Sequence, residues 1–171
     1  MNKKTGYSRP QVLLHWLSAL IIVWALASGF YVALANVSAA TKNWIGFINV
    51  SVTTLYIPFF IARLYFLFAH GRPFPPGHGV LTGRLASAMH LALYVVVAVV
   101  LITGILMMDR TINIFDVVFI VQPPIRPQWA ASFQVVHVQA CVVLSVLVAL
   151  HVAAVIKHEV SGERIIKRMS L

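Results

Sequence analysis

The sequence has few charged residues and very few acidic ones. Only 10% of its 171 residues are Asp, Glu, Lys or Arg, and only four of these are acidic. An ordinary soluble domain carries about 25% charged residues, whereas this chain is 60% hydrophobic. A soluble fold of this size would not keep so much apolar surface away from water. The composition therefore predicts a protein that lies in the lipid bilayer.

Cysteine is almost absent as well. The single cysteine, Cys141, excludes a disulfide within the chain. No C-x-x-C-H stretch is present, which excludes covalently attached c-type haem, and no cysteine cluster is available for zinc or an iron–sulfur centre. Because Cys141 lies in the middle of an apolar run, we expect it to be a small packing residue.

The formal net charge of +9 does not indicate nucleic-acid binding here. The basic residues form short groups between long apolar segments, and no aromatic and basic stripe suggests base stacking. This pattern is typical of charges that set membrane topology, so no nucleic-acid partner is expected.

Four apolar segments, at about 12–35, 44–68, 85–108 and 131–156, have the ~20 residues that a spanning helix needs. They predict an all-α membrane protein, a four-transmembrane-helix bundle, with residues 1–171 forming a single domain. The first apolar run is too long for a signal peptide and contains His15, so it is expected to be a retained span.

The basic residues divide unequally between the two sides of such a bundle. Three lie on one side: Lys42, Arg110 and Arg126. The other ten lie on the opposite side: Lys3, Lys4, Arg9, Arg63, Arg72, Arg84, Lys157, Arg164, Lys167 and Arg168. The positive-inside rule therefore places both termini in the cytoplasm. The loop over 111–129, interrupted by prolines, is too short to span twice and is expected to be an interfacial segment or lid on the outer side.

Four of the seven histidines fall inside the predicted spans: His15, His90, His137 and His151. An unsatisfied polar group in hydrocarbon costs several kcal/mol, so these residues are candidates for function. The topology puts His137 in an outer layer and the other three in an inner layer. The remaining histidines lie in or beside cytoplasmic segments and need no direct role: His70, His78 and His158.

His137 and His151 are separated by fourteen residues of one predicted helix. This interval is ~21 Å along the axis, and the two directions differ by only ~40°. One metal ion cannot bridge that distance, but two sites stacked across the bilayer can use one residue each. Two neutral imidazoles on opposite faces of a planar macrocycle form a low-spin b-type haem site. The preferred inner pair is His15 with His151.

Two alternatives to this interpretation remain. The histidines can instead hydrogen-bond across helices without any cofactor. His90 has no axial place beside a bis-histidine iron, and it can hold a haem propionate or border a quinone pocket.

Several stretches resemble the bacterial cytochrome b561 family, which includes the cytochrome subunits of nickel–iron hydrogenases. They are "YSRPQVLLHWL", "RLASAMHLALYVVV" with "LITGILMM", and "WAASFQVVHVQACVVLSVLVALHVAAVIKH". The resemblance implies a four-helix bundle with two b haems, one on each side, held by the first, second and fourth spans. Carried over to this chain, His15 and His151 hold the inner haem and His137 holds the outer haem.

The second span departs from the family pattern, because Asn49 stands where the family has the other outer ligand. Three outcomes are open. The outer haem is five-coordinate through His137, or it recruits an unusual sixth ligand, or it is absent and Asn49 bonds to His137. Arg9 and Arg63 are placed to pair with haem propionates, although ordinary membrane anchoring explains them as well.

The expected function is that of a haem b cytochrome in the bacterial inner membrane, moving electrons between the quinone pool and a second donor or acceptor. Superoxide oxidation at the outer face is one activity that the resemblance implies, and whether the protein is an enzyme stays open. Basic residues that attract an anion there, Lys42, Arg110 and Arg126, are partly offset by Asp109 and Asp116.

Two other functions compete with this one. The first is a membrane-anchor cytochrome b subunit of a periplasmic redox partner such as a hydrogenase. The second is a haem-free structural or transport protein, which a visible spectrum without a Soret band identifies.

Overall fold

The computed structural model describes residues 7–70, 80–122 and 126–169. Its main elements are four helices, α1 (Arg9–Leu34), α2 (Ala39–His70), α3 (Val80–Leu106) and α4 (Pro127–Val160). Each is long and apolar enough to cross a membrane. The predicted all-α bundle with four spans is therefore confirmed. Most of the helices extend several residues beyond the predicted boundaries.

Local sequence signals explain where α1 and α4 begin and end. Ser8 precedes α1, and its backbone N–H donates to Gln11 Oε1 at 2.9 Å, which satisfies an otherwise unpaired group. Pro127 is the first residue of α4, where a missing N–H costs nothing. Beyond the other end of α4, Gly162 has a φ of +86°, a conformation that glycine adopts without steric cost.

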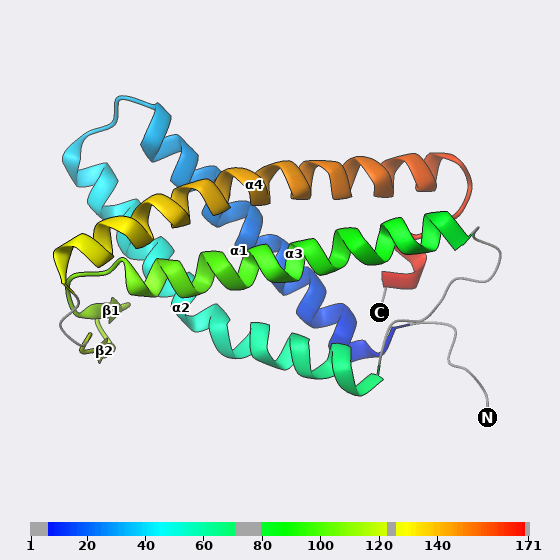
Figure 1. Cartoon of the computed structure of the whole chain (residues 1–171), viewed down its shortest axis with the longest axis horizontal. Helices are drawn as coiled ribbons and strands as arrows, with labels where there is room; N and C mark the ends of the chain where they lie inside the picture. The colour runs from blue at the N-terminus through cyan, green and yellow to red at the C-terminus, as the bar shows by residue number, and fades with distance from the viewer. Residues whose placement is uncertain (1–6, 71–79, 123–125, 170–171) are drawn as a thin grey trace.

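The helices form two closely packed pairs. α1 lies along α2 and α3 lies along α4, while α2 and α3 meet over a smaller contact. Figure 1 shows the α1–α2 pair crossing the α3–α4 pair at an angle, with the start of α1 and the end of α4 at the same end of the molecule. Many large apolar side chains face outward along all four helices, as expected for contact with lipid. The space between the two pairs is where the candidate sites lie.

A repeat of seven residues aligns the four helices in three layers. The middle layer packs as an apolar core of Ile22, Tyr56, Val97 and Leu144. Seven residues before or after each of these, about 10 Å along the axis, lies a residue of one of two further layers. The inner layer consists of His15, Arg63, His90 and His151. The outer layer consists of Gly29, Asn49, Gly104 and His137. We use these two names below.

The third loop contains a β-hairpin that the sequence analysis did not predict. β1 (Ile112–Ile114) pairs antiparallel with β2 (Val118–Ile120), and β1 packs against α2 near one end of the bundle (Figure 1). The fully buried Ser51 of α2 holds the hairpin, since its Oγ accepts a hydrogen bond from Phe115 N at 3.1 Å. β1 turns Ile112 and Ile114 inward, whereas the side chains of β2 are exposed.

Candidate functional site

The inner layer brings together one side chain from each of the four helices. Arg63 of α2 lies at its centre, with Nη2 3.1 Å from His15 Nδ1. Its Nε donates to Tyr94 Oη at 3.1 Å, and the guanidinium carbon lies 4.9 Å from the centre of the Tyr94 ring. His15 and His90 also line the same pocket, and His90 lies against His151. The predicted inner cluster of three histidines is therefore one connected group.

His90 and His151 lie against each other in this layer. Their ring centres are 5.2 Å apart with the planes nearly perpendicular at 77°. His90 Nδ1 lies 2.6 Å from the carbonyl oxygen of Ala86, one turn earlier in α3. A carbonyl only accepts hydrogen bonds, so the proton of a neutral His90 is on Nδ1 and the lone pair is on Nε2.

The proton of a neutral His15 is on the other nitrogen. A guanidinium only donates hydrogen bonds, and Arg63 points one of its N–H groups at His15 Nδ1. The lone pair of Nδ1 is thus engaged and Nε2 carries the proton. For Nε2 of His15 to bind a metal ion, the proton must move to Nδ1 and Arg63 must turn to another acceptor, such as a carboxylate.

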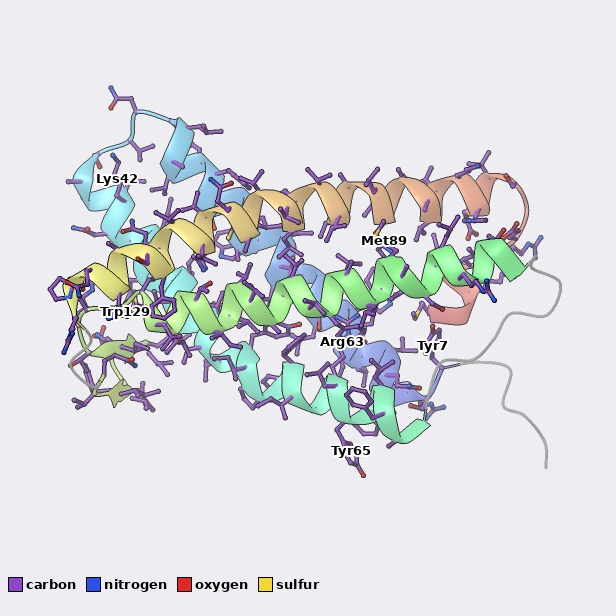
Figure 2. The ribbon with its side chains drawn as sticks, viewed as in Figure 1. Tyr7, Lys42, Arg63, Tyr65, Met89 and Trp129 are labelled. Atoms are coloured by element: carbon purple, nitrogen blue, oxygen red, sulfur yellow. The ribbon has the colours of Figure 1, made fainter. Side chains whose placement is uncertain are left out.

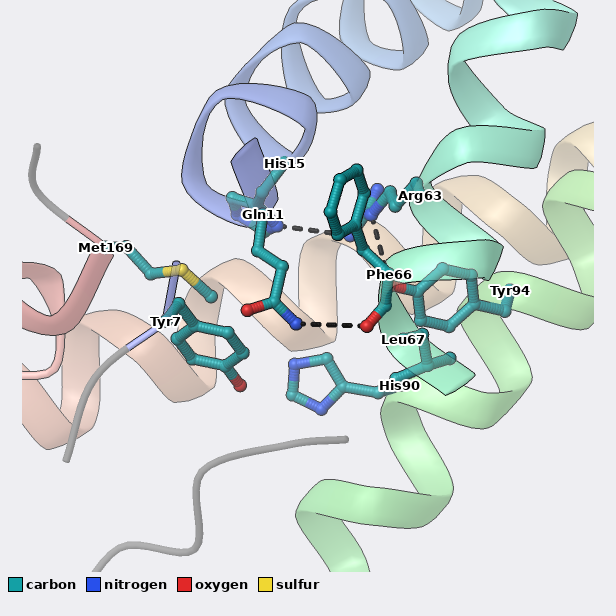
Figure 3. Close-up of a pocket in the computed structure, with 9 residues that line it drawn as sticks. All are labelled: Tyr7, Gln11, His15, Arg63, Phe66, Leu67, His90, Tyr94 and Met169. Atoms are coloured by element: carbon teal, nitrogen blue, oxygen red, sulfur yellow. Dashed lines mark hydrogen bonds between the residues drawn. The ribbon is translucent and has the colours of Figure 1, made fainter. Parts of the chain in front are cut away.

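Little space remains at the inner end. The pocket there has a volume of about 40 Å³, which is room for only a few water molecules. Figure 3 shows Tyr7, Gln11 and His90 around it, with Arg63 bonded to His15. The 3₁₀ helix η1 (Ile166–Met169) adds a wall, because Met169 lines the pocket and its carbonyl accepts from Trp16 Nε1 at 2.8 Å.

The outer layer holds a single histidine in a defined orientation. His137 Nδ1 lies 3.0 Å from the carbonyl oxygen of Val100 and 3.2 Å from Thr103 Oγ1. Since Thr103 Oγ1 donates to the Val99 carbonyl at 2.6 Å, its oxygen is left to accept from His137. Nδ1 therefore carries the proton and the lone pair is on Nε2, which lies 3.6 Å from Cys141 Sγ. This backbone-anchored tautomer is typical of a metal-binding histidine.

Glycine makes room for this ring. A Cβ atom at Gly104 would lie only 3.2 Å from Cε1 of His137, so the imidazole fits against α3 because that side chain is missing. Two more glycines, Gly29 of α1 and Gly46 of α2, line the same region, and a Cβ at either would meet no atom within 4 Å. The result is a mainly apolar cavity of about 370 Å³ between the helix pairs, within the range of about 300–1,000 Å³ for small-molecule and cofactor sites.

Asn49 lines this cavity on the α1–α2 side, opposite His137. Its Oδ1 lies 2.9 Å from Ser28 Oγ of α1. His137 of α4 is hydrogen-bonded to α3, and Asn49 of α2 is hydrogen-bonded to α1. Each of these two residues therefore has its partner within its own helix pair. Lys42 and Ile112 also line the cavity, so the hairpin forms part of its wall. Figure 2 shows Lys42 and Trp129 at the same end of the bundle.

The two layers differ in how they fit a haem. His137 fits as one axial ligand, because its lone pair and tautomer are already set. Asn49 does not fit as the other, because amide groups suit hard cations and imidazole suits iron. In the inner layer His15, His90 and His151 supply enough imidazole for two ligands.

Other predicted residues lie apart from these layers. Arg9 is exposed at the start of α1, and on that segment the inner pocket is lined by Tyr7 and Gln11 instead. His158 pairs with Glu163 at 2.8 Å. His78 and the side chain of His70 lie outside the described residues.

Sequence reasoning missed the residues that contact Asn49, Arg63 and His137 in the two layers: Ser28, Tyr94, Thr103 and Gly104. All four are ordinary in a membrane helix, because Ser, Thr and Gly are common at helix contacts. Among them, Gly104 had a signal in the sequence, because it lies fourteen residues after His90 on the same helix face.

The model of the prokaryotic cytochrome b561 family matches residues 6–170, nearly the whole chain. No curated protein sequence matches this chain.

Proposed function

The chain belongs to the prokaryotic cytochrome b561 family, and we propose that it moves electrons between the quinone pool and a second donor or acceptor in the bacterial inner membrane. The family and the four apolar helices make it a multi-pass bacterial membrane protein and a haem b cytochrome of electron transfer. The direction of transfer and the use of quinone belong to the proposal.

One observation carries the proposal: all four helices contribute an imidazole or a guanidinium to one inner layer. Three imidazoles and one permanent cation inside a bilayer are costly unless they serve a ligand. A haem bound there supplies one-electron chemistry. We assign His15 and His151 as its axial ligands. On haem binding, Arg63 would give up its hydrogen bond to His15 and pair with a haem propionate instead.

His90 takes the second role in this layer. It lines the inner pocket with Tyr7, Gln11 and Tyr94, polar side chains that can bond to a quinone head group once the layer opens to admit it. Because the lone pair of a neutral His90 is on Nε2, His90 is also the first alternative to His15 or His151 as an axial ligand of the haem iron. Mutation of His90 separates the two roles. Loss of a quinone contact would leave the haem spectrum unchanged, whereas loss of an axial ligand would change it.

Visible spectroscopy of the purified full-length chain tests the proposal. We expect a Soret band and sharp low-spin bands on reduction, followed by reoxidation of the haem by a soluble quinone analogue. A chain without a Soret band would contradict haem binding. A haem that a quinone analogue cannot reoxidise, in a chain that co-purifies with a large periplasmic enzyme, would favour the anchor-subunit function.

A further inference from the structure

We propose that the outer cavity holds a haem through His137 alone and leaves the opposite iron face, beside Asn49, open to a small diatomic ligand. This inference rests on the proposed haem content, and it gives the two ends of the bundle different chemistry. The two walls of the outer cavity, formed by α3 with α4 and by α1 with α2, carry different side chains.

The α3–α4 wall is built to present one ligand. Nδ1 of His137 donates to the Val100 carbonyl and contacts Thr103 Oγ1, and Gly104 leaves space for the ring. Only Nε2 has a lone pair for a metal ion, and its contact is a weak one with the Cys141 thiol. A histidine fixed in this way needs no rearrangement of its own hydrogen bonds to bind iron.

The α1–α2 wall has no comparable group. Its polar side chains in the cavity are Lys42, Asn49, Thr53, Thr54 and Tyr56. Among these described residues there is neither an imidazole nor a thioether, the neutral ligands common for haem iron, and Tyr56 lies seven residues after Asn49, about 10 Å nearer the inner layer. Lys42 lies seven residues before Asn49, about 10 Å nearer the outer end. The methionines that line the cavity, Met107 and Met108, directly follow the end of α3 and belong to neither α1 nor α2.

The open face would be polar at one point and apolar elsewhere. Asn49 accepts a hydrogen bond from Ser28 through Oδ1, which leaves its Nδ2 to contact a bound ligand. The polarity and access of the side opposite the proximal histidine decide whether a haem transfers electrons or binds a gas. Lys42 on the cavity wall gives the outer approach a positive charge.

Carbon monoxide is the probe, added to the dithionite-reduced, haem-loaded full-length protein. We expect it to shift the spectrum of about half of the haem, because only the outer one has an open position. Asn49→His should reduce the CO-binding fraction at least ~10-fold and add low-spin signal, since imidazole closes the open face. Asn43→His is the matched control: it makes the same substitution at an exposed position of α2 that does not line the cavity, and it should keep CO binding.

His137→Ala should lose the CO-binding fraction and keep the inner low-spin haem. Three results would overturn the inference: haem that binds no CO in the wild type, CO binding that survives His137→Ala, or CO binding that survives Asn49→His. In each of these the proposed cytochrome function still stands. A purified chain without any haem would overturn both.

Discussion

The inner and outer layers of the bundle occupy equivalent positions on the same four helices, yet they are built in opposite ways. The inner layer has three imidazoles and a guanidinium, and its pocket measures about 40 Å³. The outer layer has one imidazole, one amide and two glycines, and its cavity measures about 370 Å³. Long side chains fill the first layer, whereas glycines leave the second open.

The difference shows that the number of histidines does not measure readiness to bind a metal ion. His15 lies in the richer layer, but Arg63 engages its Nδ1 lone pair. His137 stands alone in its layer, and its hydrogen bonds already set the tautomer for binding through Nε2. The inner site therefore has to rearrange around a cofactor, while half of the outer site is preformed.

The comparison requires the layers to face opposite sides of the membrane. Reporter fusions at residue 171 and within the 111–128 loop should report opposite compartments, with the end of the chain in the cytoplasm, because basic residues concentrate on that side. The effect is all or none. The same compartment for both fusions would remove the distinction between inner and outer.

Loss of an inner ligand should have the next largest effect. His15→Ala and His151→Ala should each abolish the low-spin bis-histidine spectrum, since neither an alanine nor a water replaces the imidazole as a strong ligand. His158→Ala is the matched control, because His158 pairs with Glu163 away from the layer, and it should leave the spectrum unchanged. If either ligand variant keeps a normal low-spin spectrum, His90 takes its place in the pair.

Gly104→Ala should act on the outer layer only. The added Cβ would lie 3.2 Å from the His137 ring, so we expect the outer haem signal to fall several-fold while the inner one stays. Glycine to alanine in a helix is favourable by up to ~1 kcal/mol, so helix propensity cannot cause the loss. Gly46→Ala adds the same methyl in open space and should have a smaller effect. Equal losses in both variants would contradict the role given to Gly104.

Thr103→Val should have the smallest effect. It keeps the shape of the side chain and removes one acceptor 3.2 Å from His137 Nδ1. A hydrogen bond contributes about 0.5–1.5 kcal/mol, so redox titration should show the outer potential shifted by ~20–60 mV if the bond strengthens in one oxidation state only. Thr54→Val, on the opposite wall, is the control and should shift it less. A shift confined to the inner potential would show that the layers are not independent.

Much of the fold follows from sequence because apolar length and charge asymmetry are strong signals. The four spans were predicted correctly. His15, His90 and His151 were predicted to lie at one depth, and the structure places them in one layer. The hairpin was missed because its strands have only three residues each and its turn depends on Phe115 and Asp116 at positive φ. A positive φ is rare for a bulky residue such as Phe. The partners of His137 were missed because backbone carbonyls such as that of Val100 have no sequence signature.

The most direct test of the account is the spin state of each haem in the oxidised, full-length wild-type protein. Electron paramagnetic resonance, combined with a measurement of haem per chain, should show two haems: one low-spin from the inner layer and one high-spin from the outer layer. Two low-spin bis-histidine haems per chain would contradict the account, because some other residue would then complete the outer site where Asn49 stands.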